Sequence, residues 1–296
     1  MGYIFLGVAL LAGATKGYCG KKMGSFTANT QSAVLINIIR MSLCAVFGAI
    51  LILINQNMGY VTADLKLLLI SLVSGVSTSV FVVTWLLAVK KSAYMMVDVF
   101  LTLGSLVPMV ICFFTFGEPI SVQQWIGYAI LIAATLIMCS YNNSIKMKMS
   151  ISSLAFLIIC GFSNGVTDFS QKWFVKEFPQ TPASVFNLYT YIFAALTLVI
   201  CYTVMTRKEK PKFEEGANHP YIYVFIMAVM LITNSLFKTR AAVYLDSAQL
   251  YPLNQGMALI LSSLMASVFF KEKLTVKCIT GMGLTFIGLL IMNGVI

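Results

Sequence analysis

Ten apolar stretches, each about as long as a membrane-spanning helix, take up most of this 296-residue chain. They cover residues 2–20, 31–54, 65–89, 93–116, 121–140, 151–175, 182–206, 219–245, 248–270 and 274–295. A spanning helix needs about 20 consecutive apolar residues. Only 10% of the residues are charged, against about 25% in soluble domains. The apolar runs are continuous rather than alternating, which excludes a membrane β-barrel. The sequence therefore predicts an all-α integral membrane protein with ten transmembrane helices.

A sequence pattern in the middle of the chain returns near its end. Residues 116–140 and 270–294 each combine a helix end, a short charged corner and a new apolar helix. The pairs matched at a constant offset of 154 residues (116 to 270) are Phe116 and Phe270, Glu118 and Glu272, and Gly127 and Gly281. An odd number of helices in each copy inverts the second copy. We therefore predict two inverted five-helix repeats, residues 1–145 and 146–296, related by an axis in the membrane plane.

The two corner glutamates, Glu118 and Glu272, begin equivalent links into the fifth and tenth helices. A carboxylate near a helix N-terminus is stabilising by about 0.3–1 kcal/mol. We therefore predict that both residues are structural and cap a helix N-terminus.

The net charge of +10 comes largely from Lys and Arg at helix ends, where they meet anionic lipid or set topology, so it does not indicate nucleic acid. One set of loops holds Lys21, Lys22, Lys90, Lys91, Lys146, Lys148, Arg207, Lys208, Lys210, Lys212, Lys271, Lys273 and Lys277. The other side holds little beyond Lys66, Lys172 and Lys176. The positive-inside rule then predicts a cytoplasmic 207–218 loop and both termini outside.

The residues that carry most enzyme chemistry are scarce. The seven cysteines lie in or beside apolar stretches without a CxxC pair, which favours buried thiols. The one histidine, His219, lies at a loop end, so we expect neither a metal site nor a cofactor. Gly161–Gly165 fits the G-x-S-x-G pattern of serine hydrolases, but it lies inside an apolar helix. Close helix packing through small residues explains these glycines better, and we expect no enzyme.

Polar side chains recur at helical spacing inside four of the apolar stretches. The four stripes are Asn164, Asp168, Gln171 and Lys172; Asp98, Thr102 and Ser105; Ser71, Ser74, Thr78 and Trp85; and Tyr251, Asn254, Gln255, Ala258 and Ser262. Residues three, four and seven apart share a helix face. Polar groups are costly in hydrocarbon, so such faces line a cavity or meet a partner. Alternatives remain open, because Trp85 can simply pack, Asp98 can be a solvated helix end, and Asp168 can pair with Lys172.

Three basic residues lie deep inside predicted helices: Lys16, Lys238 and Arg240. Two residues along a helix correspond to about 200° of rotation. Lys238 and Arg240 therefore cannot share a face, and at most one of them points squarely into a cavity. The alternatives are snorkelling to the interface or pairing with Asp98 or Asp168.

The doubled corner and two longer segments resemble a known family. The segments are GATKGYCGKKMGSFTANTQSAVLINIIRMSL, across helices 1 and 2, and YPLNQGMALILSSLMASVFFKEKLTVKCITGMGLTFIGLLIMN, across the last two helices. They resemble the drug/metabolite transporter superfamily and its EamA-type ten-helix exporters. The resemblance implies two inverted five-helix repeats around a cavity lined by helices 1, 3, 4, 6, 8 and 9 and braced by helices 5 and 10. It also implies cytoplasmic termini, opposite to the lysine count, so the orientation stays open.

The last segment is also similar to the small multidrug resistance pumps, which carry a membrane-embedded carboxylate in helix 1. This chain has Lys16 there instead. A cavity with more cations than carboxylates favours anionic or zwitterionic metabolites. We therefore predict a secondary active transporter, an exporter of small organic metabolites in the plasma membrane, which works by alternating access, with a coupling ion or proton, as a monomer or homodimer. The alternatives are a multidrug efflux pump for lipophilic compounds, an intramembrane enzyme and a membrane scaffold.

Overall fold

The computed structural model describes residues 1–91, 94–139, 151–207, 209–214 and 220–295. The predicted connector at 142–150, with Lys146 and Lys148, lies outside the described residues, as do Lys208 and His219.

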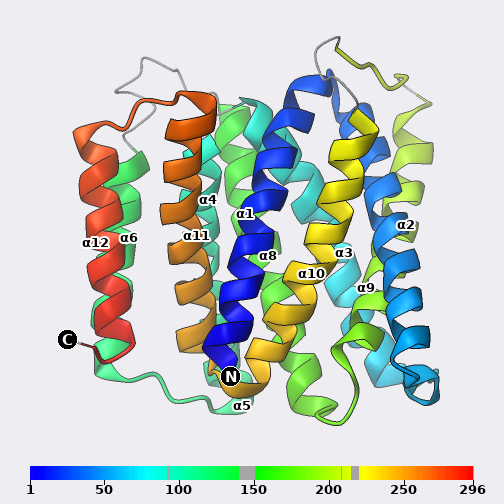
Figure 1. Cartoon of the computed structure of the whole chain (residues 1–296), viewed down its shortest axis with the longest axis horizontal. Helices are drawn as coiled ribbons and strands as arrows, with labels where there is room; N and C mark the ends of the chain where they lie inside the picture. The colour runs from blue at the N-terminus through cyan, green and yellow to red at the C-terminus, as the bar shows by residue number, and fades with distance from the viewer. Residues whose placement is uncertain (92–93, 140–150, 208, 215–219, 296) are drawn as a thin grey trace.

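The described residues fold almost entirely into α-helices (Figure 1). The helices are α1 (Gly2–Phe26), α2 (Thr30–Ile54), α3 (Leu65–Lys91), α4 (Tyr94–Gly104), α5 (Leu106–Phe116), α6 (Val122–Cys139), α8 (Ile151–Glu177), α9 (Ala183–Met205), α10 (Pro220–Tyr244), α11 (Ser247–Phe270) and α12 (Val276–Met292), with a short 3₁₀ turn, η1 (Asn57–Tyr60). Within the described ranges, eight spans are long and apolar enough to cross a membrane, and two shorter apolar helices, α6 and α12, complete the set. The expectation of a ten-helix membrane protein is confirmed.

The fourth span differs from the sequence expectation of one helix over 93–116, because it is two helices, α4 and α5, broken at Ser105. Pro108 explains the break. Proline has no N–H to donate to the carbonyl of Gly104, and its ring clashes with that carbonyl.

The packing pairs helices from the two halves of the chain. Helix α1 packs on α10, and α8 packs on α3; α2 packs on α9, and α6 on α12. Exchanging the halves turns the α1–α10 pair into the α3–α8 pair and leaves the α2–α9 and α6–α12 pairs unchanged, as an internal two-fold axis requires. Figure 1 shows α1 rising from the edge where both termini lie, whereas α8 descends towards that edge. The repeat limits at 145 and 146 fall among residues that the structure does not describe and stay a prediction.

Glycines allow helices of opposite halves to approach within backbone contact. A Cβ on Gly104 would lie 2.2 Å from the Gly161 carbonyl oxygen, and one on Gly165 would lie 2.4 Å from the Gly104 oxygen. The Ser163 hydroxyl donates to the Ile159 carbonyl of its own helix at 2.6 Å. The G-x-S-x-G segment is therefore a helix-packing surface, as the sequence predicts.

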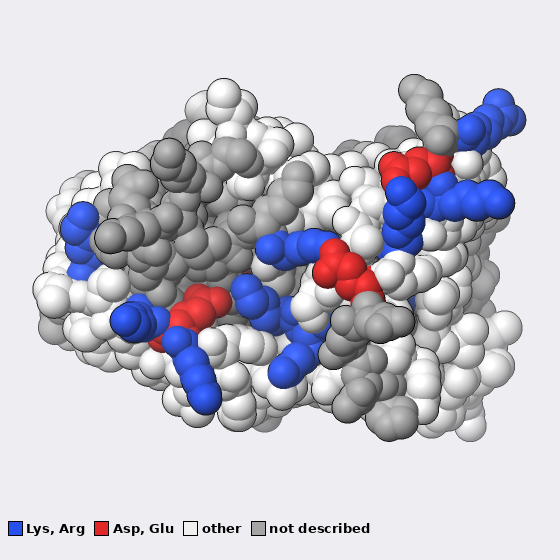
Figure 2. Space-filling model, turned by 90° about the horizontal axis from the view of Figure 1, so that it is seen from above, with Lys and Arg blue, Asp and Glu red and all other residues white. Residues whose placement is uncertain are grey.

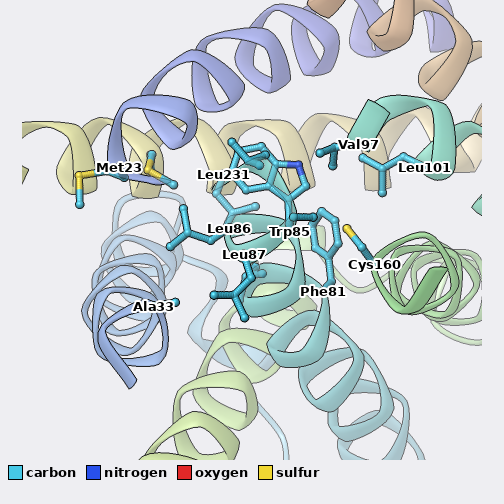
Figure 3. Close-up of a cluster of buried hydrophobic side chains, with 14 of the residues drawn as sticks. Met23, Ala33, Phe81, Trp85, Leu86, Leu87, Val97, Leu101, Cys160 and Leu231 are labelled. Carbon is cyan, nitrogen blue, oxygen red and sulfur yellow. The ribbon is translucent and has the colours of Figure 1, made fainter. Parts of the chain in front are cut away.

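The largest apolar core surrounds α3. Figure 3 shows Phe81 and Trp85 of α3 among Met23, Leu101, Cys160 and Leu231, which come from four other helices. The Trp85 indole lies against Gly20 of α1, where a Cβ would meet the ring at 2.2 Å. Trp85 thus fills the space between α1 and α3.

Of the cysteines whose side chains are described, Cys19, Cys44, Cys112, Cys160 and Cys278 are buried. Cys201 is exposed on α9, so the expectation of uniformly buried thiols is wrong there. Its side chain lies on the same exposed side of α9 as Val204, three residues later.

Basic side chains gather on one end of the helix bundle. Figure 2 looks down on the upper end, opposite the termini, and shows many Lys and Arg side chains with few acidic ones between them. Lys21, Lys90 and Lys212 each pair there with a glutamate, namely Glu272, Glu214 and Glu209. The lopsided charge expected from sequence therefore corresponds to one physical face.

Candidate substrate cavity

Two adjoining cavities lie inside the helix bundle. The larger, about 70 Å³, is walled by α1, α3, α4, α8, α10 and α11. These are the first, third, fourth, sixth, eighth and ninth spans, the set that the family resemblance implies. The smaller, about 40 Å³, extends to α9. The two share Lys16, Phe81, Asn164, Asn234 and Lys238.

Most of the residues expected at a substrate site come together here. The larger cavity is lined by Lys16, Trp85, Asp98, Asn164, Lys238, Asn254 and Gln255, and the smaller one also by Gln171. Asp168 and Tyr251 are fully buried next to these walls but do not line them. Substrate contact by these residues stays a prediction.

Arg240 requires a correction, because it does not line either central cavity. Its guanidinium is exposed and lies 5.8 Å from the centre of the Phe237 ring. It lines a separate surface cavity of about 300 Å³, together with Phe178 and Gln180. Lys238 turns inward instead, since two residues along the helix place the two cations on opposite sides.

A buried ion pair between α8 and α10 lies next to the two cavities. Lys238 Nζ lies 2.5 Å from Asp168 Oδ1. Asn164 Nδ2 donates to the other carboxylate oxygen at 3.2 Å, and Gln255 Nε2 approaches it at 3.5 Å. The Tyr251 hydroxyl donates to the backbone carbonyl of Asp168 at 2.6 Å. This arrangement decides between the sequence alternatives, because Asp168 pairs with Lys238 and not with Lys172.

Besides Lys238, the larger cavity is lined by a second cation, Lys16, and by one carboxylate, Asp98. The Lys16 ammonium lies 5.8 Å from the centre of the Phe81 ring. Asp98 lines the cavity together with Ser262 and attracts Lys16 electrostatically, whereas Arg40 and Lys238 repel Lys16. Asp98 is 8% exposed, so it is a cavity wall rather than a solvated helix end.

Sequence reasoning missed Arg40, which lies halfway along α2 and is only 2% exposed. Its Nε has no hydrogen-bond partner among the described residues. Asn37, one turn earlier on α2, is fully buried and donates to the Ala33 and Val82 carbonyls. The sequence did indicate Arg40, because a lone arginine inside an apolar run is by default a candidate functional residue.

The smaller cavity is surrounded by polar atoms that lack partners. Ser74 Oγ, Thr190 Oγ1 and Gln171 Oε1 line it, are buried and have no hydrogen bond among the described residues. Buried polar groups are normally satisfied by protein, water or ligand. The Ser235 hydroxyl, on the same wall, accepts from Gln171 Nε2 and donates to Asn187. The smaller cavity is therefore suited to water or to a polar ligand group.

Below the cavity, Glu118 joins three segments of the chain. Its Oε1 lies 3.1 Å from both Lys172 and Lys176, and its Oε2 accepts the Ser247 N–H at 2.9 Å. Burial alone would raise the pKa of Glu118, but the Ser247 N–H and the Lys172 ammonium together hold that pKa below its ordinary value. The expected helix cap exists, but the capped helix is α11 and not the helix that follows Glu118 in sequence.

At the upper end, Glu272 lies 3.6 Å from Lys21 of α1. Lys21 also donates to the Val89 carbonyl in the last turn of α3, at 3.3 Å. Glu272 thus contacts another helix of the bundle, as Glu118 does.

Comparison with known proteins agrees with this architecture. A solved structure described as "Crystal structure of protein" superposes with a TM-score of 0.75 at 13% identity, covering 99% of this chain and 97% of its own. At that identity the similarity concerns the fold alone. None of the curated proteins matches the chain in sequence. The sequence pattern of the EamA-like transporter family matches residues 151–294, which form α8 to α12 and supply Asn164, Asp168 and Lys238. This match places the second half of the chain in the EamA-like transporter family, within the drug/metabolite transporter superfamily.

Proposed function

We propose that the protein is a secondary active transporter of small anionic or zwitterionic metabolites, an exporter in the plasma membrane. Support comes from the position of the larger cavity, which both halves of the chain enclose. A cavity between inverted repeats near the middle of the membrane suits alternating access, in which one half rocks against the other. In this proposal the solute crosses chemically unchanged.

The balance of buried charges inside the bundle supports an anionic or zwitterionic substrate. The cations inside the bundle are Lys16, Lys238 and Arg40, and the carboxylates near them are Asp98 and Asp168. Because Lys238 pairs with Asp168, Asp98 remains to balance two cations, Lys16 and Arg40. An isolated charge in the hydrocarbon region costs several kcal/mol. A ligand with a carboxylate or phosphate would supply the missing negative charge.

The size of the cavity supports the mechanism. One water molecule needs about 10–15 Å³ of such space, so the larger cavity, at about 70 Å³, holds only a few water molecules. Binding therefore requires the helices around it to separate. We infer that the structure is a contracted, occluded state of the transporter.

The test is solute flux in proteoliposomes, after a screen of organic anions, zwitterions and cations for ligands that raise the melting temperature. Lys16→Met should weaken binding and flux of the best anion about tenfold or more, since about 1.4 kcal/mol corresponds to tenfold. Lys210→Met, in an exposed loop, is the matched control and should behave as wild type. Stabilisation by cations only, or normal anion flux in a folded Lys16→Met protein, would contradict the substrate class.

A multidrug efflux pump for lipophilic compounds is the second candidate. The observation that favours it is the apolar part of the cavity wall, with Phe81, Trp85 and Leu101. In the same assay, such a pump would move lipophilic compounds at a rate that Lys16→Met leaves unchanged and Trp85→Ala reduces.

A further inference from the structure

The lower end of the bundle has a charged site that connects the two halves of the chain. Lys172 of α8 pairs with Glu118, which lies in the corner between α5 and α6. The same ammonium donates to the carbonyls of Ala242 and Leu245, at the end of α10, at 3.0 and 2.7 Å. Lys172 lies on α8, the first helix of the second repeat. It binds a corner glutamate of the first repeat and the end of α10, which is the third helix of the second repeat.

The upper end has the same arrangement with the repeats exchanged. Lys21 of α1 pairs with Glu272, in the corner between α11 and α12, and donates to the Val89 carbonyl at the end of α3. Helix α1 is the first helix of its repeat and α3 is the third. Each segment that Lys172 contacts at the lower end thus has a counterpart that Lys21 contacts at the upper end.

The sequence offset supports the equivalence. Glu118 and Glu272 are 154 residues apart, and so are Lys22 and Lys176. Lys176 is the second partner of Glu118 at 3.1 Å. Lys22 lies 5.9 Å from the centre of the ring of Phe270, two residues before Glu272. The glutamates and one lysine of each site thus match at the repeat offset, whereas Lys172 and Lys21 are 151 residues apart and correspond through their contacts.

We propose that these sites are two alternating latches, which close opposite ends of the cavity in turn. The lower latch is Glu118 with Lys172 and Lys176, and the upper latch is Glu272 with Lys21. This inference rests on the proposed function, because latches have a role only if the cavity opens to each side. Opening the lower end separates the α5–α6 corner from α8 and the end of α10; opening the upper end separates the α11–α12 corner from α1 and the end of α3.

The two latches differ in strength in this structure. The Lys172 and Glu118 side chains are 4% and 5% exposed, whereas those of Lys21 and Glu272 are 23% and 16% exposed. Removing one member of a dry pair leaves an uncompensated buried charge, which is strongly unfavourable. Exposed pairs contribute much less. The lower latch should therefore dominate, so that the resting protein favours a closed lower end.

The test measures from which side the cavity can be reached. Ala258, which lines the larger cavity, is replaced by Cys in a chain whose own cysteines are replaced by Ala or Ser. A membrane-impermeant thiol reagent is applied to sealed cells and to inverted vesicles. The ratio of the two labelling rates then reports the balance between upper-open and lower-open states.

Glu118→Gln should shift the ratio about tenfold or more towards the lower face, because only the lower-closed state loses its pair. Glu272→Gln should shift it about threefold towards the upper face, in line with its exposure. Glu209→Gln removes an exposed pair with Lys212, three residues away on the same loop, and should leave the ratio unchanged. Shifts of equal sign in the two latch variants, or unchanged ratios in folded protein, would overturn the latches.

A milder pair of variants keeps the test decisive if Glu118→Gln fails to fold. Lys176→Gln removes a half-exposed partner and leaves Lys172 in place, and Lys21→Gln breaks the upper latch. They should shift the ratio in opposite directions by about twofold to threefold. Labelling of the wild-type protein distinguishes failure of the latches from failure of alternating access. Labelling from both faces with no opposite shifts would reject the latches alone, whereas labelling from one face only would reject alternating access itself.

Discussion

Replacing Asp168 by Asn removes the negative charge of the buried ion pair next to the cavities and nearly preserves the shape of the side chain. The carboxylate pairs with Lys238 at 2.5 Å and accepts a hydrogen bond from Asn164 at 3.2 Å. Without the charge, the Lys238 ammonium, 7% exposed, is left inside the bundle with an amide oxygen as its partner. Breaking one side of a buried pair costs about 3–5 kcal/mol. Because the amide retains one acceptor, we expect the lower end of that range.

The reciprocal change provides the internal control. Lys238→Met leaves the Asp168 carboxylate with the amides of Asn164 and Gln255, so we expect a cost of about 2–3 kcal/mol. The double variant, Asp168→Asn with Lys238→Met, contains no uncompensated charge. Since apolar or neutral replacements of buried pairs are often near neutral, it should lie within about 1–2 kcal/mol of wild type. The coupling energy is then about 3 kcal/mol or more.

The measurement is reversible unfolding in detergent, followed by circular dichroism for the wild type, both single variants and the double variant. Melting temperatures of the single variants should fall by about 4–12 °C, at about 2–4 °C per kcal/mol. If the double variant is as unstable as the sum of the single variants, to within about 0.5 kcal/mol, the two charges do not act as a pair and the reasoning fails.

Three further predictions concern packing, acidity and topology. Gly161→Val should lower the melting temperature by about 6 °C or more, because its Cβ would lie 2.4 Å from the Phe100 carbonyl oxygen; Gly7→Val, which has open space, should not. The pKa of Glu118 is held below its ordinary value of 4.5. The ionised Glu118 therefore stabilises the folded protein fully above pH 4.5, and this stabilisation is lost as the pH falls below that value. Melting curves in acid should show the loss in the wild type and not in Glu118→Gln. A Cys placed in the 207–218 loop should resist an impermeant thiol reagent in intact cells, and ready labelling would reverse the orientation.

The spans could be predicted from sequence because hydropathy and length determine them directly. The predicted start at 65 and end at 116 agree with the structure. The break at Ser105 could also have been predicted, because Pro108 removes a hydrogen bond four residues back. The pairing of α1 with α10 could not, since it depends on contacts between residues more than 200 positions apart.

The site was partly predictable for the same reason. Helical spacing placed Asn164 and Asp98 on inward faces, and rotation separated Lys238 from Arg240. Spacing within one helix says nothing of partners on other helices, so it could not choose between Lys172 and Lys238 as the partner of Asp168. It also left Lys172 without its actual partner, Glu118, which is 54 positions away along the chain.

The short helices at one edge of the bundle have a consequence for the surrounding lipid. Helix α12 has 17 residues and the described part of α6 has 18, or about 26 and 27 Å at 1.5 Å per residue. Helix α8 has 27 residues, or about 40 Å. Figure 1 shows α6 and α12 together at one side of the molecule. A hydrocarbon layer of about 30 Å must thin slightly to match them, at a fraction of a kcal/mol per Å. Shorter-chain lipids should therefore be enriched along this edge, where the bilayer is thinner than it is around the rest of the protein.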